Sequence, residues 1–304
     1  MEKFQLQILG CGSAKPTKQY NQSSQLLTVR EKAFLIDCGE GTQRQIVKCN
    51  AKITRLNHIF ISHLHGDHCF GVMGLMTTLG MLGRTADLHI HAHPDLEKML
   101  RPQINYFCQG ISYQIFFHAF NPNHHELLYE DRSVSVYSIP LKHKVPTCGF
   151  LFSEKKKDNH IKKEMIEFYQ IPVKEISSIK KGADFVTPEG EVISNCRLTT
   201  PAAPPKKYAY CSDTIYTESI IPIIENADCL FHEATFLQEH LPRAKETMHS
   251  TAMQAATIAG KANVKQLILG HYSARYEDVS GLLVEAKSVF ENTFLSKDGK
   301  IFEF

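Results

Sequence analysis

The chain has 304 residues, 43% of them hydrophobic, and a formal net charge of +2 at pH 7. This composition is typical of one large α/β domain or two smaller ones, and the small net charge excludes bulk charge as an argument for nucleic-acid binding. Nine cysteines without a CxxC pair favour reduced thiols over a disulfide framework. No apolar run approaches the roughly 20 residues that span a bilayer. We therefore expect a cytoplasmic protein with no membrane partner.

Short β-favouring runs alternate with helical patterns along the chain. Strands are predicted at residues 4–10, 33–37, 57–62, 88–93, 134–139, 208–212, 229–234 and 264–270, and helices at 71–82, 250–262 and 279–294. Ser250 or Thr251 is the predicted N-cap of the second helix. Because strands repeatedly precede helices, we expect a layered α/β fold. Several strands end directly in polar residues, which indicates a site along one edge of the sheets.

The segment HLHGDH, residues 63–68, follows the predicted strand 57–62 and packs three imidazoles and a carboxylate into one turn. Neutral imidazole nitrogen and carboxylate oxygen are ligands that zinc prefers. His63 and His65 point the same way from an extended chain because side chains alternate. Asp67 and His68 lie beyond the bend at Gly66. The spacing therefore predicts two neighbouring metal ions rather than one.

Three more ligand-type residues each follow a predicted strand: His143, Asp213 and His271. Together with the turn they could fill two metal sites, one from His63, His65 and His143 and one from Asp67, His68 and His271. Asp213 has two carboxylate oxygens and could bridge both. Two zinc ions about 3.5–4 Å apart can share a hydroxide and polarise a phosphoryl or carbonyl oxygen.

His89, His91 and His93 alternate along the predicted strand 88–93 and imitate a metal site. We interpret them as a packed or exposed strand face.

A lysine-rich stretch covers residues 154–200, with eight lysines against five acidic residues between positions 154 and 181. A charge run of this kind is most often a solvated insertion. The alternative is a protruding arm that contacts a polyanion through phosphate groups, which position a nucleic acid without specifying its sequence.

HLHGDH matches the HxHxDH signature of the metallo-β-lactamase superfamily. Five further segments resemble motifs of the ribonuclease Z family of tRNA 3′-processing endonucleases, in the same order: LGCGSAKPT (9–17), FLIDCGEGTQRQ (34–45), FHEAT (231–235), HST (249–251) and GHYSARY (270–276). They run from the first strand to the final helix. The resemblance implies one domain over residues 1–304, an α/β four-layer αββα sandwich, with residues 154–200 as an inserted tRNA-binding arm.

The resemblance also implies a reaction, a zinc-dependent removal of 3′ trailers from tRNA precursors. A hydroxide on two Zn²⁺ ions would attack the phosphodiester after the discriminator nucleotide, leaving a 3′-hydroxyl on the tRNA and a 5′-phosphate on the trailer. The family's metal ligands carry over onto His63, His65, Asp67, His68, His143, Asp213 and His271. Asp67 would also accept a proton, and Glu233 with His249 would deliver one. By the same resemblance the protein would be a homodimer in which the arm of one subunit grips the tRNA of the other.

Two alternatives remain open on the sequence. One is another hydrolase on the same fold, such as a phosphodiesterase, an arylsulfatase-like enzyme or a lactonase. The other is a non-catalytic RNA-binding relative, against which the complete set of ligand residues argues.

Overall fold

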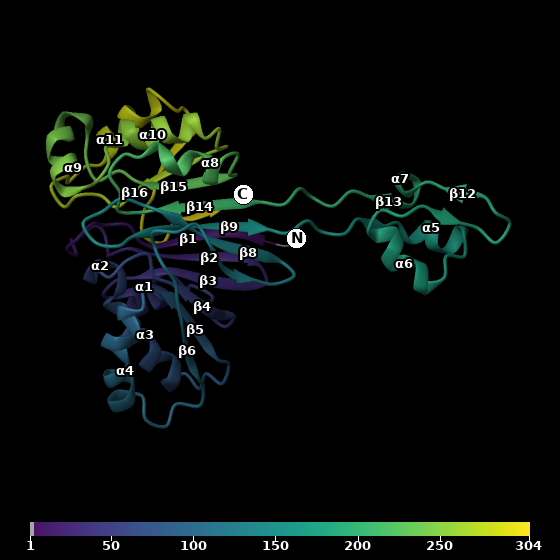
Figure 1. Ribbon diagram of the computed structural model, residues 1–304, viewed down its shortest axis with the longest axis horizontal. Coiled ribbons are helices and arrows are strands. Elements are labelled where there is room, and N and C mark those ends of the chain that lie inside the picture. Colours follow the sequence, from purple (N-terminus) through teal and green to yellow (C-terminus); the bar gives the residue numbers. More distant parts are fainter. Residues whose placement is uncertain (1–2) are drawn as a thin grey trace. The chain divides into compact units, whose positions relative to one another are not determined.

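The computed structural model describes residues 3–304, and its larger part is built around two stacked seven-stranded sheets (Figure 1). The strands of the first sheet lie in the order β18 (Ile301–Glu303), β1 (Lys3–Gly10), β2 (Ser24–Arg30), β3 (Lys32–Cys38), β4 (Leu56–Phe60), β5 (Leu88–Ala92) and β6 (Ile115–Ala119). Those of the second lie in the order β17 (Thr293–Leu295), β16 (Leu267–Gly270), β15 (Cys229–Glu233), β14 (Lys207–Cys211), β9 (Cys148–Glu154), β8 (Val134–Pro140) and β7 (Leu127–Glu130).

Helices cover the outer face of each sheet (Figure 1). Beside the first sheet lie α1 (Thr42–Lys48), α2 (Gly66–Cys69), α3 (Gly71–Met81) and α4 (Asp95–Phe107). Beside the second lie α8 (Ile221–Ile224), α9 (Leu241–Thr247), α10 (Ala252–Lys261) and α11 (Ser280–Lys287), with short 3₁₀ turns at Glu218–Ile220 and Gln238–His240. The predicted four-layer αββα sandwich is confirmed.

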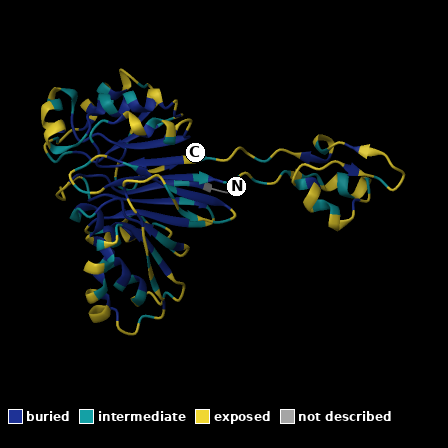
Figure 2. Ribbon diagram, in the orientation of Figure 1, coloured by how far each residue is buried: buried dark blue, intermediate teal, exposed yellow. Residues whose placement is uncertain are grey.

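The period of two along the strands produces these layers. Phe34 and Ile36 on β3 belong to the core between the sheets, whereas Leu35 between them belongs to a second core under α3 and α4. Phe60 and Ile59 on β4 divide in the same way. Because successive side chains point to opposite faces, a strand covered on both faces is apolar throughout. Figure 2 shows these strands as largely buried.

The predicted helix 279–294 is wrong beyond residue 287, where α11 ends. Residues Thr293–Leu295 instead form the edge strand β17, which pairs in parallel with β16. This pairing joins segments distant in sequence, so the local helical pattern could not predict it. The N-cap of α10 is Thr251, whose Oγ1 accepts from Gln254 N at 3.2 Å while Thr251 N donates to Gln254 Oε1 at 3.1 Å.

Residues Glu154–Pro205 form a second compact unit. Its short strands pair as β10 (His160–Ile161) with β13 (Thr199–Thr200) and β11 (Phe185–Val186) with β12 (Val192–Ile193). Its helices are α5 (Lys163–Phe168), α6 (Val173–Lys180) and α7 (Asn195–Leu198). A core of its own includes Ile171, Ile179, Phe185, Ile193 and Leu198. The lysine-rich stretch is therefore a folded module, and its role as a tRNA-binding arm stays a prediction.

Candidate metal centre

The candidate site residues lie beyond the carboxyl ends of strands from both sheets. β3, β4 and β5 run parallel in the first sheet, and β14, β15 and β16 run parallel in the second. Ligand sites of layered α/β folds commonly collect at such ends. The HLHGDH turn follows β4 and continues into α2, and His143 follows β8. Asp213 follows β14, Glu233 ends β15 and His271 follows β16.

The seven predicted ligands come together in two adjoining groups. One contains His63, His65, His143 and Asp213, the other Asp67, His68 and His271, and in each group one donor atom per residue lies within 4.8 Å of the others. Asp213 faces both. Its Oδ2 lies 3.5 Å from His63 Nε2 and 3.6 Å from His143 Nε2. Its Oδ1 lies 3.3 Å from His68 Nε2 and 3.1 Å from His271 Nε2. This placement is the one that a bridging carboxylate requires.

Two of the histidines are held from behind by groups that can only accept a hydrogen bond. His68 Nδ1 donates to Asp37 Oδ2 at 2.7 Å, and His143 Nδ1 donates to the carbonyl oxygen of Met248 at 2.9 Å. Both rings therefore carry a proton on Nδ1 and turn Nε2 toward the centre.

Hydroxyls hold two more of the histidines. Ser62 Oγ lies 3.0 Å from His63 Nδ1, and Thr235 Oγ1 lies 3.1 Å from His271 Nδ1. Each hydroxyl donates its one proton to a carboxylate, Ser62 to Asp37 at 2.8 Å and Thr235 to Glu233 at 2.5 Å, so it accepts from the imidazole. Such partners behind a histidine fix its tautomer and orientation for metal binding.

The donor set fits divalent metal ions. The four Nε2 atoms present lone pairs to the carboxylate oxygens of Asp213 and Asp67. Electron pairs that face each other in a buried site repel unless a cation lies between them. Within residues 3–304, His143 Nε2 is buried and has no hydrogen-bond partner. His65 Nδ1 lies 3.0 Å from His63 Nε2, so both nitrogens face the first candidate metal position.

The electrostatics of Asp213 and His143 agree with this fit. Burial would raise the pKa of Asp213, but the neighbouring His271, His68 and His63 hold it well below its usual value. Burial lowers the pKa of His143. The carboxylate is thus ionised and the imidazole neutral, which are the forms that bind metals.

His68 differs from His143. Burial lowers the pKa of His68, but the carboxylates of Asp213, Asp67 and Asp37 outweigh this effect and raise the pKa well above its usual value. This rise marks the excess negative charge that a cation would offset.

Glu233 and His249 meet beside the metal-ligand groups. Glu233 Oε1 lies 2.8 Å from His249 Nδ1 and accepts from Thr214 N at 2.7 Å. Burial lowers the pKa of His249, but the Glu233 carboxylate outweighs this effect and raises it to about 9. His249 also forms a close group with Asp213 and His271. The predicted proton-delivery pair is therefore placed at the centre, and its role stays a prediction.

The first loop of the chain closes over Asp67. Ala14 N donates to Asp67 Oδ2 at 2.8 Å, and Ala14 itself has the left-handed φ of 57°. The Asp67 carboxylate lies 3.5 Å from both His68 Nε2 and His271 Nε2. Asp67 therefore belongs to the second ligand group, and its additional role as proton acceptor stays a prediction.

The sequence did not predict the residues behind the histidines. Asp37 lies in the segment DCGEGTQ and accepts four hydrogen bonds, from Ser62 N, Ser62 Oγ, His68 Nδ1 and Tyr210 OH. The position of Asp37 at the end of a buried strand was the signal that could have found it. The carbonyl of Met248 gave none, because a backbone oxygen carries no residue identity.

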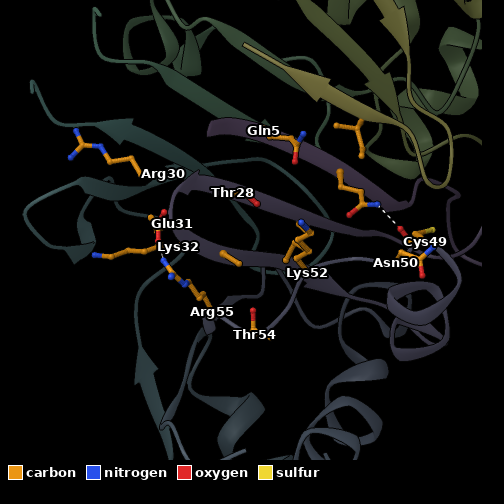
Figure 3. A pocket seen from close by; sticks show the side chains of 14 residues that line it. Gln5, Thr28, Arg30, Glu31, Lys32, Cys49, Asn50, Lys52, Thr54 and Arg55 are labelled. Atoms are coloured by element: carbon orange, nitrogen blue, oxygen red, sulfur yellow. Dashed lines mark hydrogen bonds and ion pairs between the residues drawn. The ribbon is translucent and has the colours of Figure 1, made fainter. Parts of the chain in front are cut away.

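A hollow of about 610 Å³ lies away from the centre, where the β2–β3 turn approaches the end of α1 (Figure 3). Arg30, Lys32, Lys52 and Arg55 make it basic. Lys32 pairs with Asp131 and Arg55 pairs with Glu31. Because these pairs neutralise much of the positive charge, we assign the hollow no function.

Comparison with known proteins places this site in a family. A ribonuclease Z from Bacteroides fragilis is 58% identical over 298 residues, covering 98% of both chains. The chain belongs to the ribonuclease Z family. Residues 4–161 also match the family model described as Anti-Pycsar protein Apyc1, and this region includes the HLHGDH turn.

Solved structures agree on the fold of this ribonuclease Z family member. Human tRNase Z, short form, is 23% identical and aligns with a TM-score of 0.71 over 98% of both chains. The metallo-β-lactamase fold protein YhfI from Bacillus subtilis is 20% identical and aligns with a TM-score of 0.69 over the full length of both. The predicted family and the predicted metallo-β-lactamase fold are confirmed.

Proposed function

We propose that the protein is a metal-dependent endoribonuclease that removes the 3′ trailer from tRNA precursors. The observation that carries this proposal is 58% identity over 98% of the chain to relatives named ribonuclease Z. The fold also brings together two adjoining groups of candidate metal-ligating residues, which supports it. Another hydrolase on the same fold is not favoured, because the close relatives match the whole chain, the inserted module included.

The two ligand groups would hold two Zn²⁺ ions, with Asp213 between them. Bound there, the ions would supply an activated water at neutral pH and offset the negative charge of the phosphodiester. The remaining work belongs to the protein. Asp37, Ser62, Thr235 and Met248 keep the ligand histidines in one tautomer and one orientation.

Proton delivery would fall to His249. Glu233 is fully buried and binds His249 through Nδ1, which leaves Nε2 as the ring nitrogen for the substrate. A carboxylate in this position orients an imidazole and favours its charged form. His249 would protonate the 3′ oxygen as its bond to phosphorus breaks. The tRNA would then end in a 3′-hydroxyl and the trailer would begin with a 5′-phosphate. Asp67 would accept the proton lost by the attacking water.

The module Glu154–Pro205 would bind the tRNA. Its lysines suit phosphate contacts, which supply affinity without selecting sequence. Its own small core lets it present these lysines as a folded surface. Small phosphodiesters lack the further phosphates of a tRNA, so they would not need these contacts.

A homodimer is the proposed assembly. Apolar side chains are exposed next to α2, which carries Asp67 and His68: Phe70 is 71% and Met99 47% exposed, and both line one hollow. Exposed apolar surface of this kind marks interaction sites. Phe70→Glu should convert a dimer to a monomer in analytical ultracentrifugation, and an unchanged sedimentation coefficient would contradict the assignment of this surface.

The cytoplasm is the proposed location. The free thiols, most of them buried, suit a reducing compartment. Among the helices of residues 3–304, none has the length and apolar character needed to cross a bilayer.

The decisive experiment incubates the zinc-loaded protein with a tRNA precursor that carries a 3′ trailer. The wild type should release a tRNA with a 3′-hydroxyl and a trailer with a 5′-phosphate, and His65→Ala should not. His124→Ala, which removes an exposed histidine outside the centre, is the matched control. A precursor left intact by the folded, metal-loaded wild type would refute the proposal.

A further inference from the structure

Four histidines outside the metal centre gather on the first sheet. His58 lies on β4, His89 and His91 on β5, and His118 on β6. The register of these parallel strands pairs His58 with His89 and His91 with His118. Their side chains therefore share one face of the sheet, since residues paired in register or two apart point the same way. None of the four belongs to the metal-ligand groups described above.

The four rings form two close pairs stacked on each other. His58 Nδ1 lies 3.1 Å from His91 Nε2, and His89 Nδ1 lies 2.9 Å from His118 Nε2. Between the pairs, the His58 and His89 rings stack at 4.9 Å and the His91 and His118 rings at 4.6 Å. Each imidazole is thus fixed by two others.

The two pairs differ in their access to solvent. His91 is 3% exposed and stacks on Phe60 at 4.3 Å, and Tyr129 from β7 packs on His58 at 4.2 Å. His118 is exposed on β6, the edge strand of the first sheet, and His89 is half-buried beside it. The pair His58–His91 is therefore packed against the core, and the pair His89–His118 is open to a ligand.

We propose that His89 and His118 bind a divalent late transition-metal ion, of the Ni²⁺, Cu²⁺ or Zn²⁺ class, at a site separate from the metal centre. Two imidazole nitrogens at about 2.1 Å from one ion and at a right angle are about 3 Å apart. His89 Nδ1 and His118 Nε2 share a hydrogen bond of 2.9 Å, which is close to this spacing. A bound ion would take the place of the shared proton.

The chemistry of the cluster selects the kind of ion. Its ligands are imidazoles without a carboxylate, which suits Zn²⁺, Cu²⁺ and Ni²⁺ and disfavours Mg²⁺ and Ca²⁺. Burial, reinforced by the neighbouring histidines, lowers the pKa of His58 to about 3. His58 therefore stays neutral at physiological pH and does not repel a cation bound beside it. Water would complete the coordination, since two protein ligands leave positions open.

Titration of the zinc-loaded enzyme with Ni²⁺ tests the proposal, because the metal centre is then already filled. The wild type should bind one Ni²⁺ per chain in isothermal calorimetry. His118→Ala and His89→Ala should each weaken that binding by about tenfold or more, which is about 1.4 kcal/mol. His160→Ala is the matched control, since it removes an exposed histidine of the other compact unit. His118 is exposed, so its loss should leave the fold intact.

Thermal unfolding supplies an independent measurement. An ion that joins β5 to β6 stabilises the folded state as its concentration exceeds the dissociation constant. Ni²⁺ should therefore raise the melting temperature of the zinc-loaded wild type but not of His118→Ala. Ni²⁺ binding that is unchanged in the double variant His89→Ala, His118→Ala would overturn the proposal. A wild type that binds no Ni²⁺ beyond its zinc would also overturn it. Neither result would bear on tRNA cleavage, which uses other residues.

Discussion

Replacement of Asp37 by asparagine should weaken metal binding at the His68 side of the centre. Asp37 has the left-handed φ of 56°, a conformation that asparagine adopts more readily than most residues. The two side chains have nearly the same shape. The substitution therefore removes a charge and changes hydrogen bonding without straining the backbone.

The expected magnitude follows from the four hydrogen bonds that Asp37 accepts. If the asparagine oxygen keeps the bond from Ser62 N, its amide group faces His68 Nδ1. His68 then moves its proton to Nε2, the atom that would bind metal. If the asparagine side chain is flipped, its NH₂ group faces the backbone N–H of Ser62, and two donors then meet without an acceptor. Loss of such a partner costs about 10–100-fold in metal affinity, or about 1.4–2.7 kcal/mol.

The assay is competition for Zn²⁺ between the protein and a chromophoric chelator, with the metal content measured after dialysis. Asp37→Asn should hold the ion at the His68 side about 10–100-fold more weakly, and the ion at the His63 side can weaken as well, because Ser62 links Asp37 to His63. Asp228→Asn is the matched control, because Asp228 is also a buried carboxylate but binds Lys207 N and Lys265. A folded Asp37→Asn protein that holds both ions as tightly as the wild type would refute the reasoning.

Three further outcomes are expected. Tyr210→Phe removes a hydrogen bond to the buried Asp37 carboxylate and should lower the free energy of unfolding in urea by about 1.5–3 kcal/mol. Tyr208→Phe, on the same strand, removes a bond to the neutral Gln25 and should lower it by about 0.5–1.5 kcal/mol. Equal losses in the two variants would contradict this difference. Glu233→Gln should slow precursor cleavage about 10²–10⁴-fold. The rate of this variant should recover on a substrate whose leaving 3′ oxygen is replaced by sulfur, because a sulfur leaving group needs little protonation. An equally slow rate on the sulfur substrate would argue against proton delivery. Deletion of residues 154–205 with a short linker should abolish tRNA cleavage and spare hydrolysis of bis(p-nitrophenyl) phosphate, and equal losses on both would contradict a binding role.

The sequence could predict which residues gather at the centre because each is a chemically specific residue at the end of a recognisable strand, and their metal binding stays a prediction. The HLHGDH turn alone predicted two directions of coordination, and the structure directs its residues into two groups. The supports behind the ligands could not be predicted. Met248 is 105 residues from His143, and only the folded chain brings its carbonyl to that ring.

The histidine cluster on the first sheet shows the same limit. The alternation of His89 and His91 was visible in the sequence, and we interpreted it as a strand face. His58 and His118 gave no such signal, because each stands alone on its own strand. The register of β4, β5 and β6 joins them, and register depends on contacts between distant segments.

The candidate ligands of the centre come from both halves of the sandwich. His63, His65, Asp67 and His68 follow β4 of the first sheet, whereas His143, Asp213 and His271 follow strands of the second. Ions held between them would link the two layers, in addition to the packing, the hydrogen bonds and the Lys32–Asp131 ion pair that already join them. A ligand at about 1,000 times its dissociation constant adds about 4 kcal/mol to stability, which is a large part of what holds a typical domain folded. Metal supply would then govern how long the enzyme survives proteolysis, as well as how fast it cuts.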